Sequence, residues 1–183
     1  MSESAIHDYA KAKGFHRQTL ERWLGWKPAD RDALEAIVVS LKIGENHLRD
    51  MMEWLEEISL RDRVSISEIL ASRALFAVKT DPRLGRADRL KRIKEQLRRL
   101  RYPRLAGIED AIRQKIQALK LPAEIRLSVP AGLEGGRLQV EFSAASLAEL
   151  QSFTDQLSAA AASNFATDIF ALMSGRPAVE DRG

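Results

Sequence analysis

The segment YAKAKGFHRQTLERWLGW, residues 9–26, contains two short helical patterns separated by a glycine. Ala10 is small enough to let a second helix cross close by, and Gly14 suits a turn that needs a positive φ. Apolar residues that would hold the two helices together are Ile6, Tyr9, Phe15, Leu20 and Trp23. This combination predicts a helix-turn-helix, a unit that DNA-binding proteins use to place a helix in the major groove.

The second helix of this unit would begin with polar residues. Arg17 and Gln18 lie at its N-terminal end, where a recognition helix meets base edges, and these side chains suit guanine and adenine. Arg22 is placed one turn later, where a phosphate is the expected partner. Lys13 departs from the pattern, because an apolar residue is usual at that position. An ordinary αα-hairpin with a solvated polar face fits the same spacing and stays open as an alternative.

Composition limits the class of protein. A chain of 183 residues with 45% hydrophobic residues is long enough for one globular domain or two small ones. No apolar run approaches the roughly 20 residues that cross a bilayer, and the start of the chain lacks the order of a signal peptide. We therefore expect a soluble, cytoplasmic protein with no membrane partner. Cysteine is absent, which excludes disulfides, thiolate metal ligands and thiol nucleophiles.

Positive charge is concentrated in residues 83–104, which hold ten Lys/Arg against two acids, whereas the rest of the chain holds 19 Lys/Arg and 24 Asp/Glu. Such asymmetry favours a polyanionic partner. A leucine-rich stripe with heptad-like spacing runs through this segment and predicts a seam along which two copies would pair, with rows of charge on both sides. The stripe comprises Leu90, Ile93, Leu97 and Leu100. The candidate phosphate contacts are Lys91, Arg92, Lys94, Arg98, Arg99 and Arg101, and a merely solvated basic helix is the alternative.

The remainder of residues 1–80 is predicted to be helical. Pro28 suits the first turn of a helix that ends before Gly44. A helix over about residues 46–60 would bury Leu48, Met51, Met52, Leu55 and Ile58. Ser65 with Glu68 forms a capping box, which predicts a helix that continues through Leu75.

After Pro122 the hydrophobic period changes from helical to alternating. A helix over residues 105–119 is followed by two strands around Leu127 and Val140, joined by a glycine-rich turn. Ser146 and Glu149 predict a second capping box. The helix that it opens would turn four apolar residues inward: Leu147, Leu150, Phe153 and Leu157. Residues 163–175 predict a terminal helix or an extension of that one. Because a lone hairpin is marginal in water, the strands must pack on a helix or pair across a dimer edge.

The order helix, strand, glycine-led strand and helix resembles the C-terminal dimerisation domain of ParB chromosome- and plasmid-partition proteins. The likeness covers about residues 108–157 and depends on Glu109, Ile112, Ile116, Leu119, Ile125, Gly136, Leu138, Val140, Phe142, Ser146, Leu147, Glu149 and Leu150. In that family the strands of two chains join into one sheet and the helices swap across the dimer.

Two other segments are less specifically similar to ParB proteins. KIGENHLRDMMEWL, residues 42–55, resembles the Gly-His-Ala-Arg segment after their helix-turn-helix, with Glu45 and Asn46 as additions. RDRVSISEIL, residues 61–70, resembles a later short helix. The nucleotide-binding region and the arginine-rich GERR motif are missing. The resemblance therefore implies a dimer that touches DNA and gives no support for nucleotide hydrolysis or clamp sliding.

No arrangement of residues in the sequence points to catalysis. Catalytic sites typically contain a nucleophile with a base, a phosphate-binding loop or a metal cluster, and the sequence shows no clear pattern for any of them. His47, Asp50, Glu53 and Glu57 fall near one helical face and have the chemistry to chelate a divalent ion, but a solvated polar face is the favoured explanation, since such clusters are common on amphipathic helices. We expect no enzymatic activity, no catalytic residue, no metal site and no cofactor.

Together these patterns predict an α+β, mostly α fold. Its parts are a helical, helix-turn-helix region over 1–80, a basic helix over 81–104, a ParB-like dimerisation module over 105–175 and a tail over 176–183. The predicted function is that of a homodimeric, nucleoid-associated protein that binds double-stranded DNA. A non-catalytic adaptor, whose basic helix docks on an acidic protein partner, is the competing hypothesis.

Overall fold

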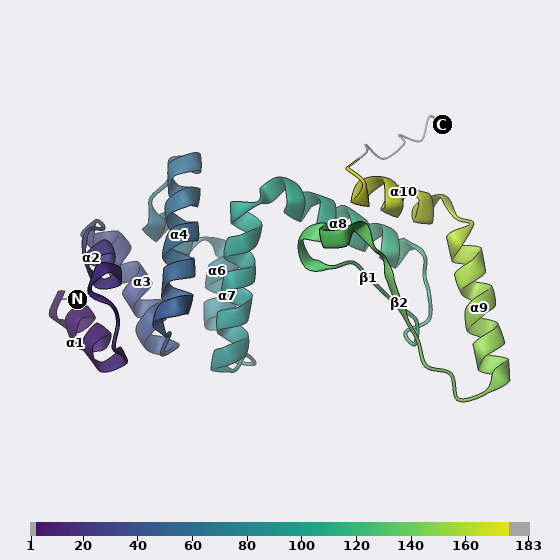
Figure 1. Ribbon diagram of the computed structural model, residues 1–183, viewed down its shortest axis with the longest axis horizontal. Coiled ribbons are helices and arrows are strands. Elements are labelled where there is room, and N and C mark those ends of the chain that lie inside the picture. Colours follow the sequence, from purple (N-terminus) through teal and green to yellow (C-terminus); the bar gives the residue numbers. More distant parts are fainter. Residues whose placement is uncertain (1–2, 176–183) are drawn as a thin grey trace. The chain divides into compact units, whose positions relative to one another are not determined.

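The computed structural model describes residues 3–175, and the predicted tail over 176–183 lies outside them. The fold is α+β and mostly α: these residues form ten α-helices and one two-stranded antiparallel sheet (Figure 1). The chain divides into two compact units, residues 1–102 and residues 103–183. Within residues 3–175, none of the helices has both the length and the apolar character to cross a membrane.

The first unit is entirely helical in its described part. Pro28 begins α3 in its first turn, and the capping box at Ser65 is formed in both directions. The helices are α1 (Glu3–Lys13), α2 (Arg17–Leu24), α3 (Pro28–Ser40), α4 (Glu45–Asp62), α5 (Ile66–Ala71), α6 (Arg73–Thr80) and α7 (Arg86–Arg101).

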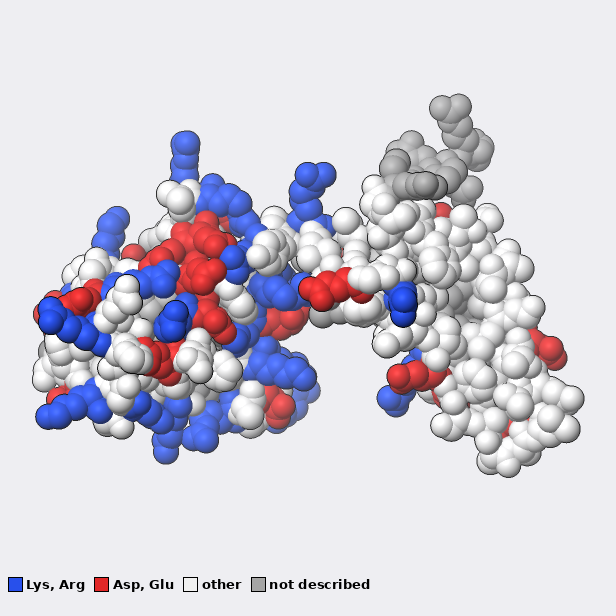
Figure 2. Space-filling model, in the orientation of Figure 1, with Lys and Arg blue, Asp and Glu red and all other residues white. Residues whose placement is uncertain are grey.

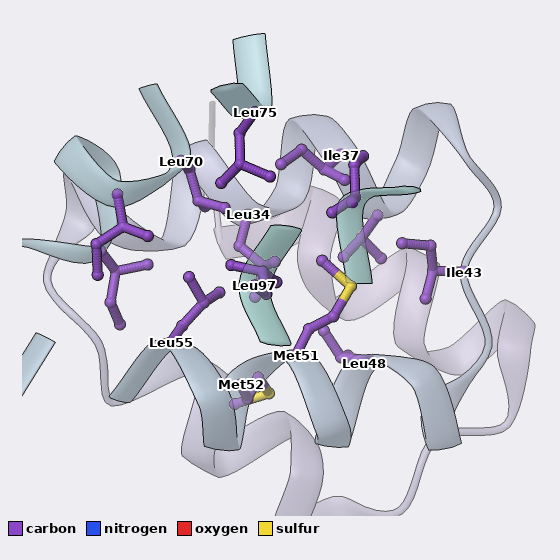
Figure 3. Packing of buried hydrophobic residues seen from close by; sticks show 14 of the residues in the cluster. Leu34, Ile37, Ile43, Leu48, Met51, Met52, Leu55, Leu70, Leu75 and Leu97 are labelled. Atoms are coloured by element: carbon purple, nitrogen blue, oxygen red, sulfur yellow. The ribbon is translucent and has the colours of Figure 1, made fainter. Parts of the chain in front are cut away.

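One hydrophobic core joins these helices, with α4 running through it (Figure 3). The five residues of α4 that were predicted to be buried are all buried. Ile93 and Leu97 of α7 have no exposed surface, and Leu90 and Leu100 pack against the same core. The leucine-rich stripe of the basic helix is therefore used inside the first unit, which corrects the idea of a seam between two copies.

The helix predicted from Ser65 through Leu75 is two helices in the structure. The chain leaves the helical region at Ser72, where ψ is 147°, and starts again as α6 at Arg73. The Ser72 N–H donates to the carbonyl oxygen of Ile69 at 3.1 Å and closes α5, whereas its hydroxyl makes no capping hydrogen bond to α6. Both helices still contribute to the core, through Leu70 and Leu75. The spacing of apolar residues alone did not reveal the break, because the same spacing continues across Ser72.

The second unit consists of α8 (Pro103–Ala118), β1 (Arg126–Ser128), an irregular turn segment (Ala131–Gly136), β2 (Gln139–Glu141), α9 (Leu147–Ala161) and α10 (Asn164–Met173). The hairpin has the expected pairing, with Leu127 opposite Val140, but each strand has only three residues. α8 and α10 pack together through Ile112 and Ile169, which have no exposed surface. Lys115 and Asp168 form an ion pair of 2.5 Å between these helices.

The apolar face of α9 was predicted to turn inward, and the structure corrects this. No residue of α9 is buried, and Leu147 is 70% exposed. The predicted capping box at its start is formed only in part. Ser146 accepts the N–H of Glu149, but the Glu149 carboxylate accepts the N–H of Ala145 instead of that of Ser146. Phe153 and Leu157 are half-buried, and the Phe153 ring packs edge-on against Phe142, whereas Leu147 and Leu150 stay exposed. The second unit therefore covers only one half of the apolar face of α9.

Candidate nucleic-acid interface

α1 and α2 pack as the helix-turn-helix pattern requires. Gly14 has a φ of 67°, which supplies the left-handed turn between the helices. Ala10 is buried where the helices meet, and Trp23 of α2 has no exposed surface. The Tyr9 hydroxyl donates to the carbonyl oxygen of Ile43 at 2.9 Å, which ties α1 to the chain just before α4. This packing leaves the opposite face of α2 in solvent.

The exposed face of α2 carries the residues predicted to contact bases. The Arg17 side chain is 89% exposed and forms an ion pair with Glu21 on the same helix, and Gln18 is also exposed. A groove runs beside them, lined by His16, Arg17, Gln18, Thr19, Arg22, Glu45 and Arg49. Arg49 was not among the predicted contacts. It comes from α4, one turn after Glu45, so only the fold brings it to this place.

The groove lies where the N-termini of α2 and α4 approach each other. Helix N-termini carry partial positive charge and favour anions. Glu45 already occupies part of this space: it accepts the backbone N–H of His16 at 3.0 Å and the Thr19 hydroxyl at 2.5 Å. The hydrogen bond from Thr19 is the main reason why the pKa of Glu45 is lowered. Of the three arginines in the lining, Arg17 pairs with Glu21 and Arg22 with Glu56, so Arg49 is the arginine whose charge acts on Glu45.

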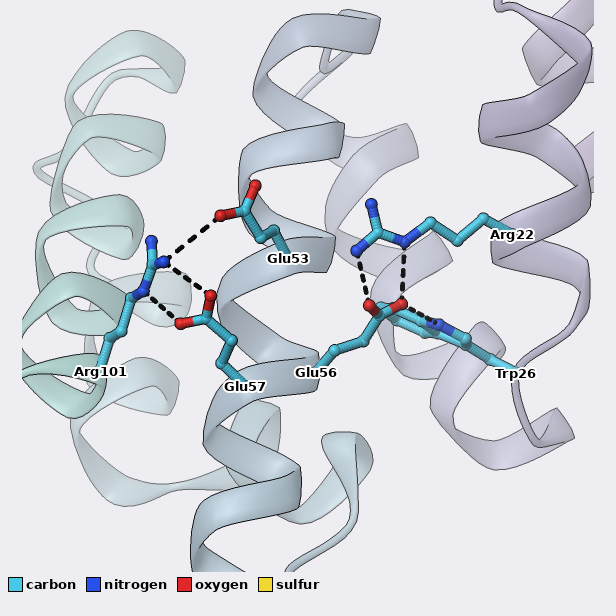
Figure 4. Close-up of polar contacts among 6 residues, drawn as sticks. All are labelled: Arg22, Trp26, Glu53, Glu56, Glu57 and Arg101. Carbon is cyan, nitrogen blue, oxygen red and sulfur yellow. Dashed lines mark hydrogen bonds and ion pairs between the residues drawn. The ribbon is translucent and has the colours of Figure 1, made fainter.

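Arg22, at the last turn of α2, is held by α4. Its Nε and Nη2 atoms donate to the two carboxylate oxygens of Glu56, at 3.0 and 2.5 Å (Figure 4). Trp26 Nε1 donates to the same carboxylate at 2.8 Å. This bidentate pair is a strong and directional arrangement for arginine. Arg22 therefore has a fixed orientation, and it remains part of the groove lining.

Three of the six cations predicted on α7 face carboxylates of the same unit. Lys94 pairs with Asp50 at 2.8 Å, and Arg101 pairs with Glu57 and, at 3.3 Å, with Glu53. Arg98 pairs with Glu95 on its own helix. The Lys94 and Arg101 side chains retain only 23% and 18% of their exposure. These charges therefore compensate acidic residues, mostly those of α4.

The other three predicted cations of α7 are less enclosed. Lys91 and Arg92 are exposed, and Arg99 is half-buried. They do not join the α2 residues in one surface, because carboxylates of α4 lie between Arg22 and Arg101 (Figure 4). Figure 2 shows a cluster of acidic side chains on the first unit with Lys and Arg on both sides. An acidic ridge, formed by Glu53, Glu56 and Glu57, thus lies between Arg22 of one predicted set and Arg101 of the other.

The possible metal-chelating face of α4 has a different role in the structure. Asp50, Glu53 and Glu57 are the partners of Lys94 and Arg101. Among residues 3–175, no group of three or more histidine, aspartate or glutamate side chains is placed to hold a metal ion.

The fold and this interface were compared with known proteins. No family model matches the chain, and no curated protein or solved structure is significantly similar to it.

Proposed function

We propose that the protein binds double-stranded DNA through the helix-turn-helix of its first unit. The observation that supports this most directly is the pair α1 and α2, which turn at Gly14 and present Arg17 and Gln18 at the exposed start of the second helix. Side chains at that position of a recognition helix reach base edges in the major groove. The groove beside them has three arginines in its lining, and arginine side chains suit the phosphates of the same duplex.

In this proposal the candidate residues contact different parts of the duplex. We assign base contacts to Arg17 and Gln18, and phosphate contacts to Arg22 and Arg49. Lys91 and Arg92, the two exposed cations of α7 in this set, are secondary phosphate contacts in this proposal. Lys94, Arg98 and Arg101 are ion-paired and their side chains are less exposed than those of Arg17 and Arg22, so we expect them to contribute less.

The proposal includes a homodimer related to partition factors and associated with the nucleoid. The resemblance of the second unit to ParB dimerisation domains supports it, and so does the exposed apolar face of α9 with Leu147 and Leu150. A three-residue, two-stranded sheet also has two unpaired edges, and such a sheet is marginal by itself. A dimer would double the number of DNA contacts and raise the apparent affinity through multivalency.

A direct test begins with the full-length chain and a pool of random duplexes, from which a preferred site is selected. Binding to that site is then measured by mobility-shift titration at several salt concentrations. We expect the substitutions Arg17→Ala and Gln18→Ala together to lower the preference for the site by at least tenfold, since each base contact is worth about 1–3 kcal/mol. Arg22→Ala should lower the salt slope by about 0.9.

The matched control for these variants is Arg113→Ala. It removes an equally charged, exposed, ion-paired arginine from α8 in the second unit. We expect this control to bind as the unmodified protein does. Failure to bind any duplex at low salt, or equal losses in the control and in the α2 variants, would contradict the proposal.

A protein-interaction adaptor is the second candidate, and one surface favours it. Leu60, at the end of α4, is 84% exposed and lines a groove with Trp26, Val64 and Ile66. Exposed apolar side chains beside a groove are typical of protein contacts. Capture of one stoichiometric protein partner that survives nuclease treatment and is lost in Leu60→Glu would favour this candidate.

A further inference from the structure

Two carboxylates of α4 fasten α2 at its two ends. At the start of α2, Glu45 accepts the N–H of His16 and the hydroxyl of Thr19. At its last turn, Glu56 accepts two hydrogen bonds from Arg22 and one from Trp26, just beyond the helix. Thr19 and Arg22 belong to α2 itself, so both contacts act on the helix that carries the proposed base contacts.

The spacing of the two carboxylates matches this role. Glu45 and Glu56 are eleven residues apart in α4, which is about three helical turns. They therefore lie on the same face of α4, about 16 Å apart along its axis. α2 has eight residues and is about 12 Å long, so one carboxylate reaches each end of it.

The contact at Glu56 leaves one edge of the Arg22 guanidinium available. Its Nε and Nη2 atoms are taken by Glu56, while Nη1 donates no hydrogen bond within residues 3–175. Figure 4 shows the remaining nitrogen of Arg22 pointing away from the Glu56 carboxylate. Arg22 also lines the groove. Glu56 therefore orients the guanidinium and leaves Nη1 available for a further contact.

We propose that Glu45 and Glu56 are positioning residues that fix the orientation of α2 and thereby determine sequence preference. This inference rests on the proposed function. A recognition helix must hold its base contacts within a fraction of an ångström, whereas general attraction to phosphates tolerates rotation of the helix. Both carboxylates repel DNA by their charge, so they oppose non-specific affinity while they support discrimination between sequences.

The two carboxylates are thus expected to lower affinity for any DNA and to raise discrimination between sequences. A residue that only stabilised the fold would not have these two opposite effects. Glu56→Gln removes the charge but keeps the shape, and Thr19→Val removes the buried hydroxyl that Glu45 accepts. For each variant, affinities for the selected site and for a scrambled duplex are measured in parallel. We expect the ratio of the two affinities to fall about tenfold, because the base contacts are misaligned. Affinity of Glu56→Gln for the scrambled duplex should stay the same or rise.

Glu53→Gln is the matched control, because Glu53 belongs to the same acidic ridge but its ion pair is with Arg101, and it acts on Arg22 of α2 through its charge alone. It should raise affinity for both duplexes by the same factor and leave their ratio unchanged. Hydrogen exchange of the α2 amides should be faster in Glu56→Gln and Thr19→Val, and unchanged in Glu53→Gln.

An unchanged affinity ratio in Glu56→Gln, or an equal fall in both of its affinities, would overturn the inference. Because Glu56 is partly exposed, we expect Glu56→Gln to fold, and it tests the inference even if Thr19→Val does not fold. Failure of the proposed function gives a different result. If the unmodified protein prefers no sequence, then the proposed reading of DNA by α2 is wrong, whatever the variants do.

Discussion

At the scale of single residues, Gly14 is the position on which the arrangement of α1 and α2 depends. Its φ of 67° is open to glycine and costly for other residues, although a Cβ there would meet no atom within 4 Å. We expect Gly14→Ala to lower the free energy of unfolding by about 1 kcal/mol, entirely through backbone strain. Urea denaturation followed by circular dichroism measures this change.

Gly25→Ala is the control for that prediction. Gly25 ends α2 with a φ of −69°, which alanine adopts freely, and its Cβ would make ordinary contacts of 3.4 Å. This substitution should leave stability nearly unchanged or raise it slightly. Equal destabilisation by both substitutions would show that the turn at Gly14 does not need its left-handed backbone.

The roles of Gly14 and Trp23 could be predicted from the sequence. Both follow from local rules: a glycine where a turn needs positive φ, and an apolar residue at helical spacing. The role of Glu45 does not follow from such rules, since its partner Thr19 is 26 residues away in sequence. One signal was present, because Glu45 and Glu56 are spaced to share one face of α4. The sequence alone does not say which helix lies against that face.

At the scale of elements, α7 has two kinds of basic residue, and we expect them to respond differently. Lys94→Ala with Arg101→Ala should lower stability by about 1 kcal/mol, because these side chains pair with α4 and lie over the Trp54 ring at 5.2 and 6.0 Å. Lys91→Ala with Arg92→Ala should leave stability unchanged and weaken DNA binding. Thermal melts and mobility-shift titrations of both double variants check this.

The opposite result would show that the paired cations of α7 also contact DNA. If the Lys94 and Arg101 variant loses more DNA affinity than the Lys91 and Arg92 variant at equal stability, the ion pairs with α4 open when DNA binds. The sequence predicted the helix and its charge correctly as a pattern, because both are local. It could not identify which cations are already paired, since Asp50 and Lys94 are 44 residues apart.

At the scale of the whole molecule, the exposed face of α9 predicts the association of two copies. Leu147 is 70% exposed and Leu150 is 41% exposed, and a second copy would remove them from water. Light scattering of the full chain should give twice the mass of 20.5 kDa. Leu147→Glu with Leu150→Glu should give a monomer that keeps its first unit folded.

Leu60→Glu is the matched control, because Leu60 is even more exposed but belongs to the first unit. This variant should keep the mass of the unmodified protein. A single-chain mass for the unmodified protein throughout a dilution series would remove the homodimer from the proposal.

The second unit shows where prediction from sequence stops. The alternation around Leu127 and Val140 was sufficient to predict a hairpin, because the period of a strand is a local property. The burial of α9 was not predictable in this way. An apolar stripe requires a partner, but the stripe does not say whether the partner is in the same chain, and α9 shows no buried residue in one copy.

The aromatic residues of the chain are distributed unevenly between the two units. All three tryptophans and both tyrosines lie in residues 1–102, whereas the aromatic rings of residues 103–183 are phenylalanines. Intrinsic fluorescence, excited in the indole band, therefore reports on the first unit alone. Trp26 donates to the carboxylate that holds Arg22, so a duplex that arrives at α2 will alter its emission without any added dye. Assembly through α9 will leave that emission unchanged, which makes the two events optically separable.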